Sequence, residues 1–135
     1  QAAANTSSST PRIGEPWPGQ GGSSAGIMRG RDSEPDYHLI VGPELGEQNW
    51  QPAMDAAAAV ACDGHNDYRL PYRAEQALQF ANVPELFQRE WYWSCEQRAA
   101  NSNFAWAQHF AGGSQNTWGK DVNAFRARAV RRIKI

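Results

Sequence analysis

The chain has 135 residues, of which 41% are hydrophobic and 20% charged, which fits one folded domain rather than two. Its net charge of −1 excludes a global electrostatic attraction to nucleic acid or to an anionic membrane. No apolar run approaches the roughly 20 residues of a membrane span, so no membrane insertion is expected. Six tryptophans are many for this length, and tryptophan serves both in cores and at binding surfaces.

The N-terminal segment 1–24 is rich in Ala, Ser, Thr, Pro and Gly and has no hydrophobic periodicity. It also lacks the basic-then-apolar pattern of a secretion signal. We expect a flexible arm or linker, either a disordered tail or an attachment arm that orders against a partner. The folded domain is predicted over residues 25–135.

The domain begins with two short β-prone runs, "AGIMRGRD" and "YHLIVGP", which the turn-rich "SEPD" joins. They predict an antiparallel hairpin that pairs Ile27–Arg29 with Tyr37–Val41. A helix is then expected in "QNWQPAMDAAAAVACDG", with Asn49 as its N-cap and Gly64 marking its stop. Its small side chains predict close packing against a sheet.

A second helix is expected in "DYRLPYRAEQALQFANV", with Pro71 at its start. Alanine and leucine recur there at helical spacing and predict a buried stripe. The stripe consists of Ala74, Ala77, Leu78 and Ala81, widened by Phe80 and Val83.

Three alternating runs predict strands, namely "REWYWSCEQ", "FAWAQHFAGG" and "FRARAVRRIKI". Loops rich in Asn, Ser and Gly separate them. In the last run Ala127 and Ala129 point away from Arg126 and Arg128, and the broken alternation at residues 130–131 predicts a bulge or twist. The resulting order β–β–α–α–β–β–β predicts an α+β fold with helices first and antiparallel strands second.

Basic residues crowd the last ten positions, and alternating arginines on the outer face of a strand are favoured over an anion or nucleic-acid patch. These residues are Arg126, Arg128, Arg131, Arg132 and Lys134.

Catalytic and metal-binding patterns are weak. His38, His65 and His109 fall on separate elements, and "DGHND" reads as a turn because it lacks the oxygen positions of an EF-hand. The spacing of Cys62 and Cys95 matches no metal knuckle and leaves open two buried thiols or one disulfide. A Cys95–His109 pair on neighbouring strands lacks a cation or helix N-terminus that would lower the thiol pKa. We therefore predict no catalytic residue, metal or cofactor.

The C-terminal strands and loops combine Trp and Tyr with Asn, Ser, Gln and Gly, which is the chemistry of an antibody paratope. Strand alternation places Trp91 and Trp93 on one face, where we expect both to be mostly buried. The candidate ligand-binding residues are Tyr92, Asn101, Asn103, Trp106, Gln108, His109, Asn116 and Trp118.

Blocks spread over about residues 12–133 resemble the C-terminal domain family of the Legionella collagen-like adhesins. The blocks are "DYRLPYRAEQALQFANV", "WYWSCEQ", "AWAQHF", "GG" and "RARAVRRI". The residues that match the family pattern are Arg69, Leu70, Pro71, Arg73, Glu75, Trp91, Tyr92, Trp93, Ser94, Ala105, Trp106, Phe110, Arg128, Ala129, Val130 and Arg131. The chain departs from the pattern at Tyr68, Tyr72 and Cys95.

This resemblance implies a C-type-lectin-like fold in which two helices flank twisted antiparallel sheets and the C-terminal strands and loops form the ligand face. Similar domains are the variable proteins of diversity-generating retroelements. The calcium–sugar tripeptides of true lectins are missing, so calcium-dependent sugar binding is not carried over. The segment "IGEPWPGQGG", which leads into the domain, is similar to the corresponding segment of phage-encoded members of the family.

We therefore expect a non-enzymatic, receptor-binding or adhesin-type module on a phage virion, associated with its tail, or on a bacterial cell surface. The alternative is a structural virion protein, for capsid decoration or tail assembly, that binds its own particle. The expected partners are a host-surface protein or glycan, other virion proteins through residues 1–24, and further copies of the chain. Nucleic acid is not an expected partner.

Overall fold

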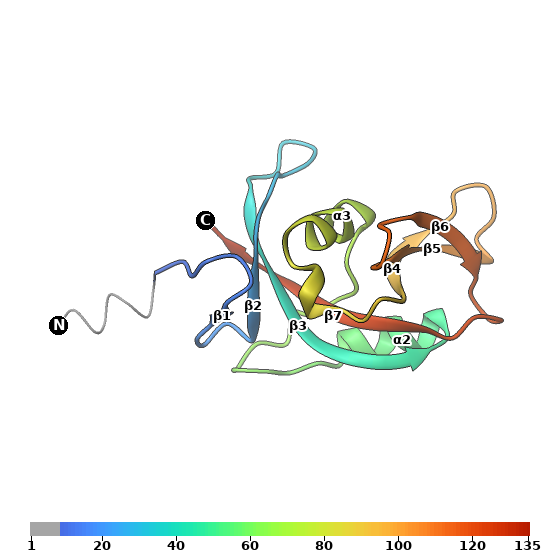
Figure 1. The fold of residues 1–135 in the computed structure, drawn as a ribbon, viewed down its shortest axis with the longest axis horizontal. Coiled ribbons are helices and arrows are strands. Elements are labelled where there is room, and N and C mark those ends of the chain that lie inside the picture. The colour runs from blue at the N-terminus through green and yellow to red at the C-terminus, as the bar shows by residue number, and fades with distance from the viewer. Residues whose placement is uncertain (1–8) are drawn as a thin grey trace.

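The computed structural model describes residues 9–135 and has an α+β architecture built on a seven-stranded sheet (Figure 1). The strands are β1 (Pro16–Trp17), β2 (Gly22–Met28), β3 (Tyr37–Gln48), β4 (Trp91–Gln97), β5 (Phe104–His109), β6 (Gln115–Gly119) and β7 (Phe125–Lys134). The helices are α2 (Trp50–Ala58), α3 (Arg73–Asn82) and the short 3-10 helix η1 (Pro84–Leu86). The predicted α+β class is thus confirmed.

The sheet has the order β1-β2-β3-β7-β4-β5-β6. Its neighbours are antiparallel except at β4 and β7, which meet in parallel at Tyr92 and Arg126. The long strands β3 and β7 run through the middle of the molecule, with β1 and β2 at one end and β4, β5 and β6 at the other (Figure 1). The two ends of the sheet therefore present separate surfaces.

The predicted hairpin is present, because β2 and β3 pair Met28 with Tyr37 and Ile27 with His38. Helix α2 begins directly after Asn49, whose extended backbone (ψ 167°) confirms it as the N-cap residue. The helix ends at Ala58, earlier than the predicted stop at Gly64.

The chain joins the sheet earlier than the predicted boundary at residue 24. Pro16 and Trp17 pair with Ser23 and Gly22, so much of the expected arm belongs to β1 and β2. Trp17 is buried and meets the ring of His38 edge-on at 5.0 Å. This one tryptophan supplies the apolar area that the polar composition around it lacks. The part of the predicted arm in residues 1–8 lies outside the described residues.

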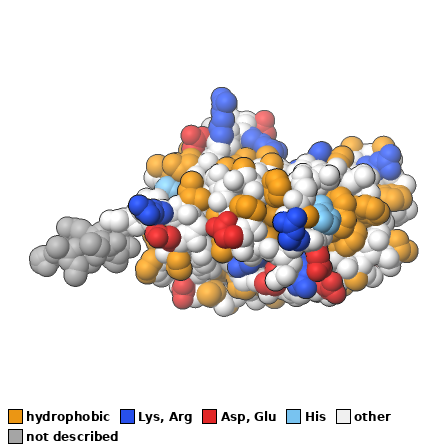
Figure 2. Space-filling model, viewed as in Figure 1, with side chains coloured by type: hydrophobic (Ala, Val, Ile, Leu, Met, Phe, Trp, Pro, Cys, Tyr) orange, Lys and Arg blue, Asp and Glu red, His pale blue; other side chains and the backbone are white. Residues whose placement is uncertain are grey.

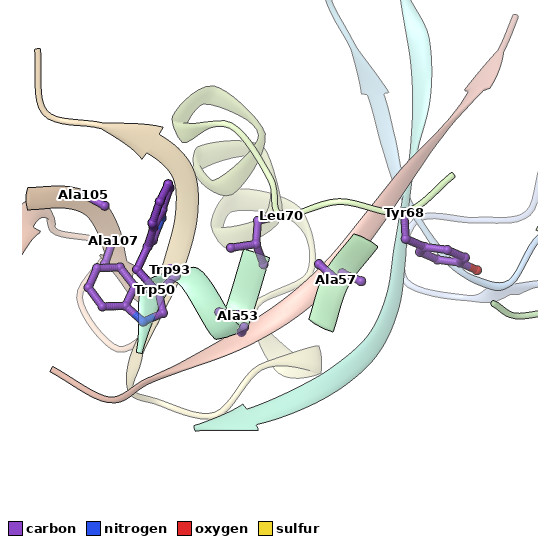
Figure 3. Packing of buried hydrophobic residues seen from close by; sticks show 10 residues of the cluster. Trp50, Ala53, Ala57, Tyr68, Leu70, Trp93, Ala105 and Ala107 are labelled. Atoms are coloured by element: carbon purple, nitrogen blue, oxygen red, sulfur yellow. The ribbon is translucent and has the colours of Figure 1, made fainter. Parts of the chain in front are cut away.

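Two hydrophobic cores lie on opposite faces of the sheet, one under each helix. On the α2 face, Ala53 and Ala57 of the helix (Figure 3) share one core with Ala127 and Ala129 of β7, and all four are fully buried. Alanine on both sides lets the helix approach the sheet closely, as the sequence predicted. Trp93, also fully buried, fills the space beside them (Figure 3).

Helix α3 buries a different face from the one that the sequence predicted. Ala77 and Ala81 are exposed, whereas Glu75, Gln76 and Gln79 are buried. Leu78 and Phe80 still contact the core of that face, and Val83 is fully buried within it. On this polar inner side, Gln76 finds partners in the carbonyl oxygens of Tyr92 and Trp93, which accept from its Nε2 at 3.0 and 3.2 Å.

The predicted irregularity in the last strand lies in its neighbour. Strand β7 is continuous, and the register shifts occur in β3 between Val41 and Gly46. The pattern breaks at residues 130–131 because both faces of β7 are covered. Val130 packs in the α3 core, whereas Ala129 packs in the α2 core. A strand buried on both faces does not alternate strictly between apolar and polar residues.

Candidate functional site

The predicted site residues lie on β4, β5, β6 and their loops, but they divide between two faces of this part of the sheet. The register opposes Trp91 to His109, Ala107 to Asn116 and Ala105 to Trp118. His109, Asn116 and Trp118 therefore share the face of Trp91 and Trp93. Tyr92, Trp106 and Gln108 point to the other face, which α3 covers. The eight residues do not form one site.

The face that α2 shares carries a group of partly buried rings, which we call the aromatic face: Trp91, His109, Trp118 and Phe125. The Trp91 ring lies 5.1 Å from the ring of His109 and 5.2 Å from that of Trp118, both edge-on. Phe125 contacts both tryptophans, with ring centroids 6.0 and 5.7 Å apart. Trp93 next to them is fully buried in the α2 core, and Trp91 packs against the same core as a partly buried ring, so the prediction that both are mostly buried is confirmed.

Exposed amides border the aromatic face. Asn116 lies on the same side of β6 as Trp118, and Asn101 and Asn103 occupy the exposed loop between β4 and β5. That loop is ordered by a local bond, since Asn101 Oδ1 accepts from the backbone N–H of Asn103 at 3.0 Å. Hydrophobic side chains gather at this end of the molecule (Figure 2). Rings and short amides thus stand together on a stiff scaffold.

Two predicted ligand contacts are structural side chains instead. Tyr92 is 1% exposed, and its hydroxyl donates to Glu44 Oε1 at 2.8 Å and accepts from the N–H of Gln88 at 2.9 Å. Gln108 is equally buried, and its Oε1 accepts from Gln115 Nε2 at 2.7 Å. Because both side chains are buried, neither can reach a ligand at the surface.

Trp106 is half-buried on the α3 side of the sheet. The Arg73 guanidinium lies 3.4 Å from the centroid of its ring, which is a close cation–π contact. Gln115 fixes this arginine from both ends, since its Oε1 accepts from Arg73 Nε and its Nε2 donates to the Arg73 carbonyl. Trp106 therefore anchors the start of α3 and lies apart from the aromatic face.

Sequence reasoning missed a polar cluster around Glu75, which is fully buried. Arg69 donates to both of its carboxylate oxygens, at 2.7 and 2.9 Å. The Tyr37 hydroxyl donates to Glu75 Oε2 at 2.5 Å, and the backbone N–H of Tyr72 donates to Oε1 at 2.9 Å. Burial alone would raise the pKa of Glu75, but the Arg69 fork and these two donors outweigh it and hold the pKa below its ordinary value. Burial and the bond to Glu75 raise the pKa of Tyr37 to about 12.

A pocket of about 390 Å³ opens beside this cluster. The tip of the β2–β3 hairpin, the end of β7 and the start of α3 enclose it. Its lining residues are Met28, Arg29, Arg31, Asp32, Glu34, Tyr37, Tyr72, Glu75 and Arg132. The clustered charges in "RGRDSE" and the "RLPYRAE" block were the available signals, but only the fold brings them to the end of the last strand.

The groups that nucleophilic catalysis would need are not prepared for it. Both cysteines are free thiols, so the disulfide alternative is wrong. Burial raises the pKa of Cys95 to about 11, which keeps the thiol protonated near neutral pH. His109 lies opposite Trp91, and its Nδ1 accepts from the N–H of Ala111. No group of three His, Cys, Asp or Glu that could hold a metal ion occurs in residues 9–135.

Two of the four C-terminal arginines are held inside the domain, so the expected row on an outer face is wrong in part. Arg131 is buried and donates to Asp67 Oδ1 at 2.7 Å. Arg128 donates to the carbonyl of Gly42 at 2.7 Å and also to that of Leu86. Arg131 thus ties the loop at Asp67 to β7, Arg128 ties β3 and η1 to it, and neither guanidinium is free to bind an anion.

Neither a protein-family model nor a curated protein sequence matches this chain. Within residues 9–135, neither helix has the length and apolar character needed to span a bilayer.

Proposed function

We propose that the chain is a non-enzymatic binding module with a C-type-lectin-like domain, carried on a phage virion or a bacterial cell surface. The observation that carries the proposal is the aromatic face. The partly exposed rings of His109 and Trp118 are each held against the ring of Trp91, and Asn116 on the same face is exposed. Rigid rings lose little entropy on binding, and short amides adapt their hydrogen bonds to different partners.

Two features of the fold support the C-type-lectin-like assignment. The long strands β3 and β7 pair with each other and gather the two helices on opposite faces. The strands β4, β5 and β6 form an antiparallel unit whose backbone pairing with the long strands runs through β4 and β7. The exposed loop of this unit and its edge strand β6 are where a fold of this type presents its ligand face.

Binding to intact cells tests the proposal. The fluorescently labelled chain is mixed with a panel of Gram-negative and Gram-positive bacteria, and bound fluorescence is measured by flow cytometry. We expect saturable binding to a subset of the strains. Asn116→Ala and Trp118→Ala should each weaken it about tenfold or more, as for anchors near the centre of an interface.

Asn66→Ala is the matched control, because Asn66 is an exposed asparagine outside the aromatic face. It should bind as the parent chain does, and circular dichroism should show that each variant is folded. Binding to no strain, or equal losses in Asn116→Ala and Asn66→Ala, would refute the proposed face.

The placement on a virion needs a separate observation. Electron microscopy of particles that carry the chain should show copies whose aromatic face is open to solvent. Copies whose aromatic face is covered by another virion protein would favour a structural role in capsid decoration or tail assembly.

A further inference from the structure

The pocket beside Glu75 is a second recessed site, built from elements that the aromatic face does not use. Its volume of about 390 Å³ is within the range of small-molecule sites, about 300–1,000 Å³. Acidic and basic side chains stand together on the projecting β2–β3 connection that forms its rim (Figure 2). The chemistry of its lining defines what it can bind.

Three guanidiniums in the pocket are free of ion pairs. Arg29, Arg31 and Arg132 have no carboxylate within 4.0 Å among residues 9–135, whereas Arg69 and Arg131 do. Arg132 lies over the ring of Tyr37, with its Cζ 4.1 Å from the ring centroid. A guanidinium held by stacking presents its donors as a planar fork that matches a carboxylate.

The acidic groups limit how much negative charge a ligand can bring. Glu75 is fully committed to Arg69 and Tyr37, so its charge is already neutralised. Asp32 and Glu34 remain without a side-chain partner in the described part of the chain. Their carboxylates repel a polyanion but accept hydrogen bonds from hydroxyl or ammonium groups.

The remaining lining is apolar. The rings of Tyr37 and Tyr72, with the side chain of Met28, form a wall suited to a carbon skeleton. Tyr72 is 37% exposed and is itself covered in part by Arg69, 4.7 Å from its ring centroid. The wall therefore keeps its position without a ligand.

We propose that this pocket binds a small monocarboxylate that also carries hydroxyl or ammonium donors, the chemistry shared by acidic sugars and amino acids. The carboxylate would lie on Arg132 with Arg29 and Arg31, the donors would face Asp32 and Glu34, and the carbon skeleton would pack on the tyrosines. This site does not depend on the aromatic face.

Titration of the isotopically labelled chain tests the proposal. The probes are N-acetylneuraminic acid, D-glucuronic acid and L-glutamine, followed by amide chemical shifts in NMR spectra. We expect either the sugar acids or the amino acid to shift the amide signals of residues 29–37 and 132, with a dissociation constant of about 1 mM or tighter. Saturation by the sugar acids alone, or by glutamine alone, identifies which of the two sources the pocket accepts.

The methyl ester of N-acetylneuraminic acid is the control on the ligand side, because it keeps the ring and loses the charge. We expect it to bind at least about tenfold more weakly than the acid. Equal binding of acid and ester, or tighter binding of inorganic phosphate than of any carboxylate, would overturn the assignment.

On the protein side, Arg132→Gln and Arg31→Gln should each weaken binding about tenfold. Both residues are exposed, so the variants should fold. If Arg132→Gln fails to fold, Arg31→Gln at the hairpin tip still tests the site. Arg89→Gln removes the same charge from an exposed arginine outside the pocket and should leave binding unchanged. An equal loss in Arg89→Gln, or shifts confined to β4–β6, would refute the site.

Discussion

Replacement of Glu75 by glutamine should be the most damaging isosteric change in this domain. The carboxylate accepts four hydrogen bonds, two from Arg69 and one each from Tyr37 and the backbone of Tyr72. An amide has one acceptor oxygen, and its NH₂ group would face donors. The variant therefore leaves the Arg69 charge without a partner.

The magnitude follows from the burial of the pair. Removing one partner of a buried ion pair costs about 3–5 kcal/mol. The Arg69 side chain is 28% exposed, and water can solvate part of its charge, so the lower end applies. We expect Glu75→Gln to lower the free energy of unfolding by about 3 kcal/mol, or the melting temperature by about 10 °C.

Urea denaturation followed by tryptophan fluorescence measures this change as a shift of the midpoint at constant slope. Glu90→Gln is the matched control, because Glu90 also pairs with an arginine, Arg126, but half of its side chain is exposed. That variant should leave the midpoint almost unchanged. If both variants shifted the midpoint equally, the argument that burial makes the Arg69–Glu75 ion pair important for stability would fail.

Three further predictions concern groups of unusual environment. Arg69 and its neighbours keep the pKa of Glu75 below its ordinary value of 4.5. The stability supplied by the Glu75–Arg69 ion pair should therefore be present above pH 4.5 and lost as the pH falls further. Urea titrations at stepped acidic pH should show this loss in the parent chain and not in Glu75→Gln. Gln79 is fully buried with both amide atoms unpartnered in the described residues, so Gln79→Met should be neutral or stabilise by about 1 kcal/mol, and a clear loss of stability in the same denaturation assay would disprove this. Cys95, with its pKa raised to about 11 by burial, should resist iodoacetamide at neutral pH until urea unfolds a Cys62→Ser chain, and rapid labelling of the folded chain would contradict it.

The parts of the fold that were predictable are those with local signals. Asn49 before an alanine-rich run marked the start of α2, and alternation marked the last strand. The face of α3 that points into the core was not predictable from local signals. Alanine is tolerated both in the core and at the surface, so the alanine pattern does not decide which face is buried. The carbonyl groups that accept hydrogen bonds from Gln76 belong to β4, which follows α3 in the sequence.

The candidate site was predictable in kind but not in arrangement. Alternation correctly separated Tyr92 from Trp91 and Trp93, yet it could not show that helices cover both faces of this sheet. The covering helix α3 is what removes Tyr92 and Gln108 from the surface. The pocket was not predictable at all, because Arg29 and Arg132 come together only through pairing of β2 with β3 and of β3 with β7.

The central position of β7 has a consequence for biosynthesis. The ribosome delivers residues 125–134 after every strand that they pair with, yet β7 is the strand that joins β3 to β4 in the sheet. Until then the emerging polypeptide carries two unsatisfied sheet margins and two half-built cores. Nascent chains stalled before β7 should therefore be open to proteases and holdase chaperones, and closure of the domain should coincide with its emergence from the exit tunnel.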